Sequence, residues 1–103
     1  MTDGKIFVKV IRSDKNIDTI LIQINEKPFN LHLKPHSIIN RKICDIRNED
    51  IYNEVNPQAR NLEGLFDILN IRSGNIYNPT ARDEMVSIVE FVLPEGYTLK
   101  DGQ

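Results

Sequence analysis

The chain has 103 residues, of which 40% are hydrophobic and 27% are charged, and its formal net charge is −2. This length fits one domain over residues 1–103, and the composition argues against intrinsic disorder. So small a negative charge gives no general attraction to nucleic acid or to an anionic membrane. Cys44 is the single cysteine, which excludes an internal disulfide, and we expect its side chain to be buried or half-buried. The sequence has no apolar run near the roughly 18 residues of a membrane-spanning helix.

The N-terminal third of the sequence predicts three β-strands joined by short turns. Residues 6–12, 19–24 and 29–34 alternate apolar and polar side chains, which is the two-residue period of a strand. The side chains expected to face the core are Ile20, Ile22 and Ile24 in the second strand and Phe29, Leu31 and Leu33 in the third. Because the connections are short, we expect an antiparallel meander with one face open to water.

The segment from Ser37 to Val55 allows two interpretations. Ile39, Ile43 and Ile46 stand at helical spacing, and Ser37 is a suitable N-cap. The β-branched residues and the polar run over residues 47–50 instead favour an irregular or partly extended connection. The sequence leaves both open.

A helix is predicted from Asn56 to about residue 70 or 71. Asn at the N-cap followed by Pro57 at the first helical position is a favourable start. Its apolar residues fall on one face and are Leu62, Leu65, Phe66 and Leu69. Gly64 lowers the intrinsic stability of this helix by up to about 1 kcal/mol relative to Ala, and it permits another backbone to approach closely. Tertiary packing must therefore hold the helix in place.

The longest apolar strand is predicted from Met85 to Leu93, before Pro94. Both of its faces are apolar: Val86, Ile88 and Val92 lie on one, and Met85, Val89, Phe91 and Leu93 on the other. The predicted helix is the expected cover for one face. Glu90 either marks where its face reaches water or pairs with a base such as Arg72 or Arg82. Residues 97–103 are expected to form a polar tail. Together these elements predict an α+β fold: a small antiparallel β-meander of three N-terminal strands, one amphipathic helix and a C-terminal strand.

No motif predicts a catalytic, cofactor or metal site. His32 and His36 are separated by Pro35 and follow a strand, so they cannot share a helical face as metal ligands. The serines lack a nucleophile elbow, and the glycines are too scattered for a phosphate-binding loop. The basic residues are interleaved with acids and have no aromatic platform beside them, which disfavours nucleic-acid binding.

The predicted binding residues are Ile76, Tyr77, Asn78 and Pro79, in the loop between the helix and the last strand. Apolar groups are unusual in such a loop. Ile76 and Tyr77 either fold back onto the core or form an exposed contact surface of the kind on which interfaces concentrate their binding energy.

The stretch from Leu65 to Pro94 resembles small LysM-like proteins from the baseplates of contractile-tailed phages and related injection machines. The resemblance rests on the helix segment LFDILN (65–70), the loop GNIYNP (74–79) and the strand end VEFVLP (89–94). The tryptophans common before that loop are absent, and the three N-terminal strands are not covered. The resemblance implies a non-enzymatic assembly part that joins tail-tube or sheath elements to the wedge.

Three functional hypotheses follow. The first is a structural or assembly subunit, such as a phage tail or baseplate component, located in the cytoplasm or the virion. The second is a small phage or bacterial inhibitor or adaptor that binds one host protein through a sheet edge or the Tyr77 loop. The third is an enzyme on an α+β fold. The sequence favours a protein that is not an enzyme, whose partners are other proteins rather than nucleic acid, membrane or small-molecule substrate.

Overall fold

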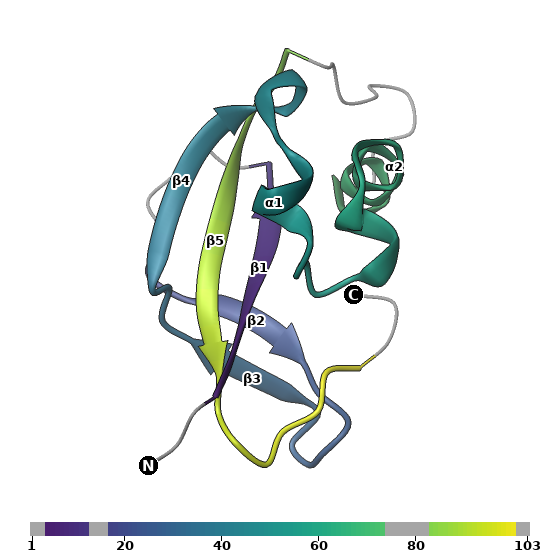
Figure 1. Ribbon diagram of the computed structural model, residues 1–103. Helices are drawn as coiled ribbons and strands as arrows, with labels where there is room; N and C mark the ends of the chain where they lie inside the picture. Colours follow the sequence, from purple (N-terminus) through teal and green to yellow (C-terminus); the bar gives the residue numbers. More distant parts are fainter. Residues whose placement is uncertain (1–3, 13–16, 74–82, 101–103) are drawn as a thin grey trace.

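The computed structural model describes residues 4–12, 17–73 and 83–100 (Figure 1). The elements in chain order are β1 (Lys5–Ile11), β2 (Ile20–Gln23), β3 (Asn30–Leu33), β4 (Ser37–Lys42), a 3₁₀ turn η1 (Ile43–Asp45), α1 (Asn48–Ile51), a second 3₁₀ turn η2 (Pro57–Arg60), α2 (Leu62–Ser73) and β5 (Met85–Leu93). All strand pairs within the sheets are antiparallel. The predicted α+β class is confirmed, and so are the bounds of the last strand.

The central strand of the main sheet is β5. It pairs with β1 on one side and with β4 on the other, in the order β1-β5-β4. The predicted N-terminal strands are all present, but only β2 and β3 pair with each other, as a separate hairpin. The first strand pairs with β5 instead of β2. A strand that is apolar on both faces is best buried in the middle of a sheet, and this explains the long-range pairing.

Each face of the main sheet has its own cover. Val86 and Ile88 of β5 pack with Leu65 and Leu69 of α2, as the helical spacing predicts. On the other face the hairpin covers β5 through its buried isoleucines, and the residues in this second cluster include Ile20, Ile22, Ile24, Val89, Phe91 and Leu93. Figure 1 shows the hairpin crossing the lower ends of the sheet strands, while α1 and α2 lie to the right of the sheet, on the side of β1. Both faces of β5 are covered as predicted, except at Met85 and Val92, which are 54% and 39% exposed.

Two side chains predicted to be inside are outside. Phe29 is 55% exposed because it lies in the turn before β3, where its carbonyl accepts the Ile24 N–H at 2.8 Å. Leu31 and Leu33 are half-buried against the core as expected. Cys44 is exposed. Its neighbour Ile43 points into the core from the η1 turn and is fully buried, which leaves Cys44 on the outer side.

The predicted single helix is divided in two. Asn56 accepts the Gln58 N–H at 2.9 Å and Pro57 follows it, so the predicted start is confirmed, but the first turn is the 3₁₀ helix η2. Asn61 is extended, with φ −139° and ψ 163°, and its side chain accepts the Gly64 N–H at 2.9 Å, which begins α2. A Cβ atom on Gly64 would collide with the Gln58 carbonyl. The close backbone approach predicted at this glycine is confirmed.

The C-terminal segment is not the free polar tail that we expected, at least as far as Lys100. Leu99 forms a bridge with Ile24, and the Lys100 N–H donates to Gln23 O at 3.1 Å. Glu26 accepts the Thr98 N–H through Oε2 at 2.9 Å. This backbone hydrogen bond lowers the pKa of Glu26 below its ordinary value of 4.5. The segment therefore lies along β2 because Leu99 supplies an apolar contact and Glu26 a charged acceptor.

Candidate interaction surface

The predicted binding residues Ile76, Tyr77, Asn78 and Pro79 lie outside the described residues, as does Arg82. Within residues 4–12, 17–73 and 83–100, no group of His, Cys, Asp and Glu side chains could hold a metal ion. The Oε1 atom of Glu90 lies 3.8 Å from Nε2 of His36, whose side chain is 65% exposed. Glu90 is itself 35% exposed, so it stands where its face reaches water, which was one of the two expectations.

Within the described residues, the outer edge of β4 is bare. All six residues of β4 are exposed, and none of the other described strands pairs with its outer side. The Ile43 N–H donates to Glu84 O at 3.0 Å, which fixes the phase of the β4–β5 ladder. Because bonded and non-bonded pairs alternate in an antiparallel ladder, Ile39 and Arg41 bond to β5. The backbone N–H and C=O groups of Ile38, Asn40 and Lys42 consequently point outward.

The outer edge of β1, at the opposite side of the same sheet, is covered. The Val8 N–H donates to Asn53 O at 3.1 Å, and Val8 O accepts the Val55 N–H at 3.0 Å. The Asn53 side-chain amide donates to Ile6 O at 3.0 Å. Glu54 then completes the edge with its carboxylate, because Oε2 accepts the Val10 N–H at 2.9 Å. A short segment of chain and two of its side chains here substitute for a neighbouring strand.

Glu54 is a fully buried acid with a structural role. Its second oxygen, Oε1, accepts the Asn56 N–H at 2.8 Å, and Arg60 Nε donates to its main-chain carbonyl at 2.9 Å. Both carboxylate oxygens therefore bond to backbone N–H groups, as a buried charge requires. Nothing in the sequence marked Glu54 for burial, since acids of this kind more often lie on the surface.

A groove lined by both apolar and acidic side chains adjoins the β4 edge, on the face of the sheet that carries α1 and α2. Its volume is about 230 Å³, and Ile39 of β4 and Ile6 of β1 lie along it. Ile39 is 45% exposed, Ile6 50% and Tyr52 67%. The acidic side chains that also line the groove are Glu49, Asp50 and Glu90. Exposed apolar groups gathered next to a free strand edge are typical of interaction sites.

The hairpin also has an edge, on β3, that no other described strand pairs with, but this edge is shorter than that of β4 and presents fewer apolar side chains to a partner. This strand has only four residues, and Leu31 and Leu33 are turned toward the core. The other hairpin edge, on β2, is lined by residues 98–100. Of the strand edges in the described part of the chain, β4 is therefore the longest that is open.

Sequence reasoning missed the β4 strand because it looked for alternation. Ser37, Ile38 and Ile39 have the polar and β-branched character of a strand, but two adjacent isoleucines break the two-residue period. On an edge strand with both faces exposed there is no buried face to impose that period. The β-branched content of the segment, which favoured an extended connection, was the usable signal.

None of the helices in the described part of the chain is long and apolar enough to cross a membrane. No protein-family model matches the chain, and neither a curated protein nor a solved structure matches it. The geometry of the described residues must therefore support any functional proposal.

Proposed function

We propose that this chain is a non-enzymatic subunit that joins other proteins, and that a partner adds a β-strand to the outer edge of β4. The observation that carries the proposal is the contrast within one sheet. The β1 edge is covered by Asn53, Glu54 and Val55, whereas β4 has six exposed residues and none of the other described strands pairs with its outer side. Bare edges are avoided in soluble proteins unless they are used, because they template the addition of another strand.

The chemistry of the surface specifies the partner segment. A strand added to β4 bonds to the backbone of Ile38, Asn40 and Lys42, so the main chain supplies affinity without regard to sequence. Its alternate side chains lie on the groove side, next to Ile39. Because Glu49 and Glu90 line that groove, the partner segment is extended, apolar at alternate positions and basic at its margin.

Membership of a phage tail or baseplate is the finer part of the proposal, and its support is the resemblance of residues 65–94 to LysM-like baseplate proteins. On this proposal the chain is carried in the virion, where neighbouring subunits cover the β4 edge. Such a subunit is expected to associate with itself when it is purified without those neighbours, because an open edge can pair with a second open edge.

An inhibitor or adaptor that binds one host protein is the second candidate. The same open edge favours it, since strand addition is also a route to stoichiometric recognition. The two candidates differ in solution. An adaptor whose edge recognises the strand of one host protein and not its own edge is expected to remain monomeric at high concentration, whereas an assembly subunit is expected to self-associate.

Light scattering after size-exclusion chromatography, over a range of concentrations, tests the proposal with two sets of variants. The first is Ile38→Pro, which removes an outward N–H of β4. The second is the double alanine variant at Ile76 and Tyr77, the predicted loop site. We expect the wild type to self-associate and Ile38→Pro to be a folded monomer.

The contrary outcomes are separable. If the wild type stays monomeric, the assembly proposal fails and the adaptor takes its place. If Ile38→Pro associates as strongly as the wild type while the double alanine variant does not, the contact surface is the loop and β4 is not the binding edge.

A further inference from the structure

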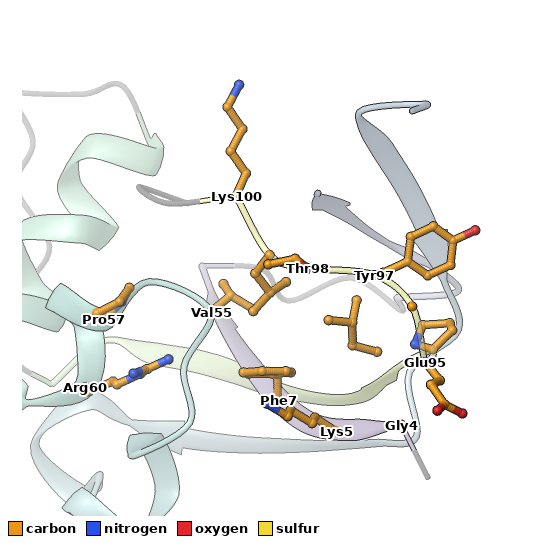
Figure 2. Close-up of a pocket in the computed structure, with 14 residues that line it drawn as sticks. Gly4, Lys5, Phe7, Val55, Pro57, Arg60, Glu95, Tyr97, Thr98 and Lys100 are labelled. Atoms are coloured by element: carbon orange, nitrogen blue, oxygen red, sulfur yellow. The ribbon is translucent and has the colours of Figure 1, made fainter. Parts of the chain in front are cut away.

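A second cavity lies on the opposite face of the main sheet from the groove beside β4. It has a volume of about 370 Å³ and is walled by the C-terminal segment from Leu93 to Lys100 (Figure 2). Its other lining residues come from the start of β1 and from the chain around η2, including Phe7, Val55 and Arg60. A volume of about 30 Å³ per water molecule gives it room for about a dozen water-sized groups. This is the lower end of the size range of small-molecule sites.

The lining combines apolar surface with positive charge. Phe7, Val55 and Leu99 belong to or pack against the buried cluster on this side of the sheet, so they form an apolar floor. The charged lining residues are Lys5, Arg60 and Lys100, against a single acid, Glu95. A net positive lining is notable in a chain whose formal net charge is −2.

Arg60 is held in place at the cavity. Its Nε donates to Glu54 O at 2.9 Å, so one edge of the guanidinium is fixed to the main chain. No described residue is seen to accept a hydrogen bond from its two terminal nitrogens. In Figure 2 the nitrogen end of Arg60 is turned toward Phe7, whereas Lys100 extends away from the cavity. A guanidinium fixed through Nε presents its terminal nitrogens to a ligand, and carboxylates match that geometry.

We infer that this cavity binds a small apolar carboxylate, with the carboxylate on Arg60 and the apolar group over Phe7, Val55 and Leu99. Lys5, which lines the same cavity, adds to the positive field. The inference is independent of strand addition at β4, because the two surfaces lie on opposite faces of the sheet. It also gives the ordered C-terminal segment a role, as the wall that closes the site.

The test is NMR titration of the full chain with 3-phenylpropionate, using the uncharged 3-phenylpropanamide as a matched control. A ligand of this size in a half-open site is expected to bind with a Kd on the order of 1 mM. The amide resonances of Phe7, Val55 and Leu99 should move with the acid. The amide compound should bind about tenfold more weakly, since it cannot form the charged pair.

Variants of Arg60 separate a binding role from a structural one. Arg60→Met should weaken binding of the acid about tenfold, and Arg60→Lys should recover only part of it, because lysine keeps the charge but not the planar guanidinium that matches a carboxylate. Lys34→Met removes an exposed cation just after β3, outside the cavity and outside β4, and should leave the Kd unchanged. If Arg60→Met unfolds the chain, the comparison of acid with amide compound on the wild type still decides the question.

Three outcomes would overturn the inference. The first is that the acid and the amide compound bind equally well. The second is that the acid moves no cavity resonances at about 10 mM, ten times the expected Kd. The third is that, in a parallel titration, a peptide with a free C-terminal Phe binds while the free acid does not. The last outcome would assign the cavity to the end of a protein chain.

Discussion

The two edges of the main sheet are treated in opposite ways. At the β1 edge, four backbone groups (Ile6 O, Val8 N–H, Val8 O and Val10 N–H) bond to residues 53–55. At the β4 edge, the backbone groups of Ile38, Asn40 and Lys42 point outward with no described strand beside them. The comparison teaches that this fold can close a sheet edge with a carboxylate in place of a strand, and that the described residues do so at β1 but not at β4.

Removing the Glu54 carboxylate should uncover the β1 edge and have the largest effect. Glu54→Ala leaves the buried Val10 and Asn56 N–H groups without their acceptor, and we expect a loss of roughly 3–5 kcal/mol in the free energy of unfolding. Glu54→Gln is the matched control, because its amide oxygen can still accept one of these bonds, and it should lose about half as much. Urea unfolding measures both. A loss below about 1 kcal/mol for Glu54→Ala would mean that the carboxylate does not hold the edge.

Gly64→Ala tests the packing of η2 against α2, the two helical segments that come after residues 53–55 in the chain. Propensity alone predicts that alanine stabilises α2 by up to about 1 kcal/mol. The new Cβ would instead collide with the Gln58 carbonyl, so α2 must move away from η2, and we expect a net loss of about 2–3 kcal/mol. Thermal unfolding gives the sign directly. A higher melting temperature in the variant would show that the approach of η2 to α2 is not close.

Neighbouring isoleucines in β4 provide a matched pair at the bare edge. The Ile39 N–H bonds to β5, so Ile39→Pro should cost about 1–3 kcal/mol through the lost ladder bond. The Ile38 N–H points outward, and Ile38→Pro should cost less than about 1 kcal/mol. Urea unfolding of the two variants side by side measures the difference. Equal losses would mean that the assigned phase of the ladder is wrong.

The smallest effect concerns the β2 edge. The exposed carboxylate of Glu26 helps to hold residues 98–100 along this edge by accepting the Thr98 N–H. The Thr98 backbone N–H lowers the pKa of Glu26 in the folded chain, so the contribution of this bond is present above about pH 4.5 and is lost as the pH falls through the lowered value. The Thr98 amide proton should therefore exchange faster with solvent, relative to the intrinsic rate, in acid. Glu26→Gln should remove this pH dependence. A pH-dependent protection of Thr98 that persists in Glu26→Gln would assign it to another group.

Much of the fold follows from local periodicity. The bounds of β5, the buried residues of its two faces apart from the exposed Met85 and Val92, and the buried face of α2 at Leu65 and Leu69 were predictable, because a strand or helix buried on a fixed side repeats in sequence. Asn56 and Pro57 likewise mark a helix start wherever they occur. These signals need no knowledge of the neighbouring elements.

The rest depends on contacts between distant residues. Glu54 is buried because Val10, 44 positions away, needs an acceptor. The β1–β5 pairing joins the two ends of the chain, and β4 is exposed on both faces, so it has no period to detect. Of the candidate site, the sequence indicated an open sheet edge in general but not the strand that provides it. The predicted residues Ile76 to Pro79 lie outside the described chain, and their role in binding stays a prediction.

Hydrogen exchange of the two edges in the dilute protein tests the central claim most directly. The outward amide protons of Val8 and Val10 on β1 are bonded to Asn53 and Glu54, and they should exchange only when the domain opens. Those of Ile38, Asn40 and Lys42 on β4 should exchange near the rate of an unstructured peptide. If the β4 amides are instead as protected as those of β1, the edge is already covered, and strand addition at β4 is contradicted.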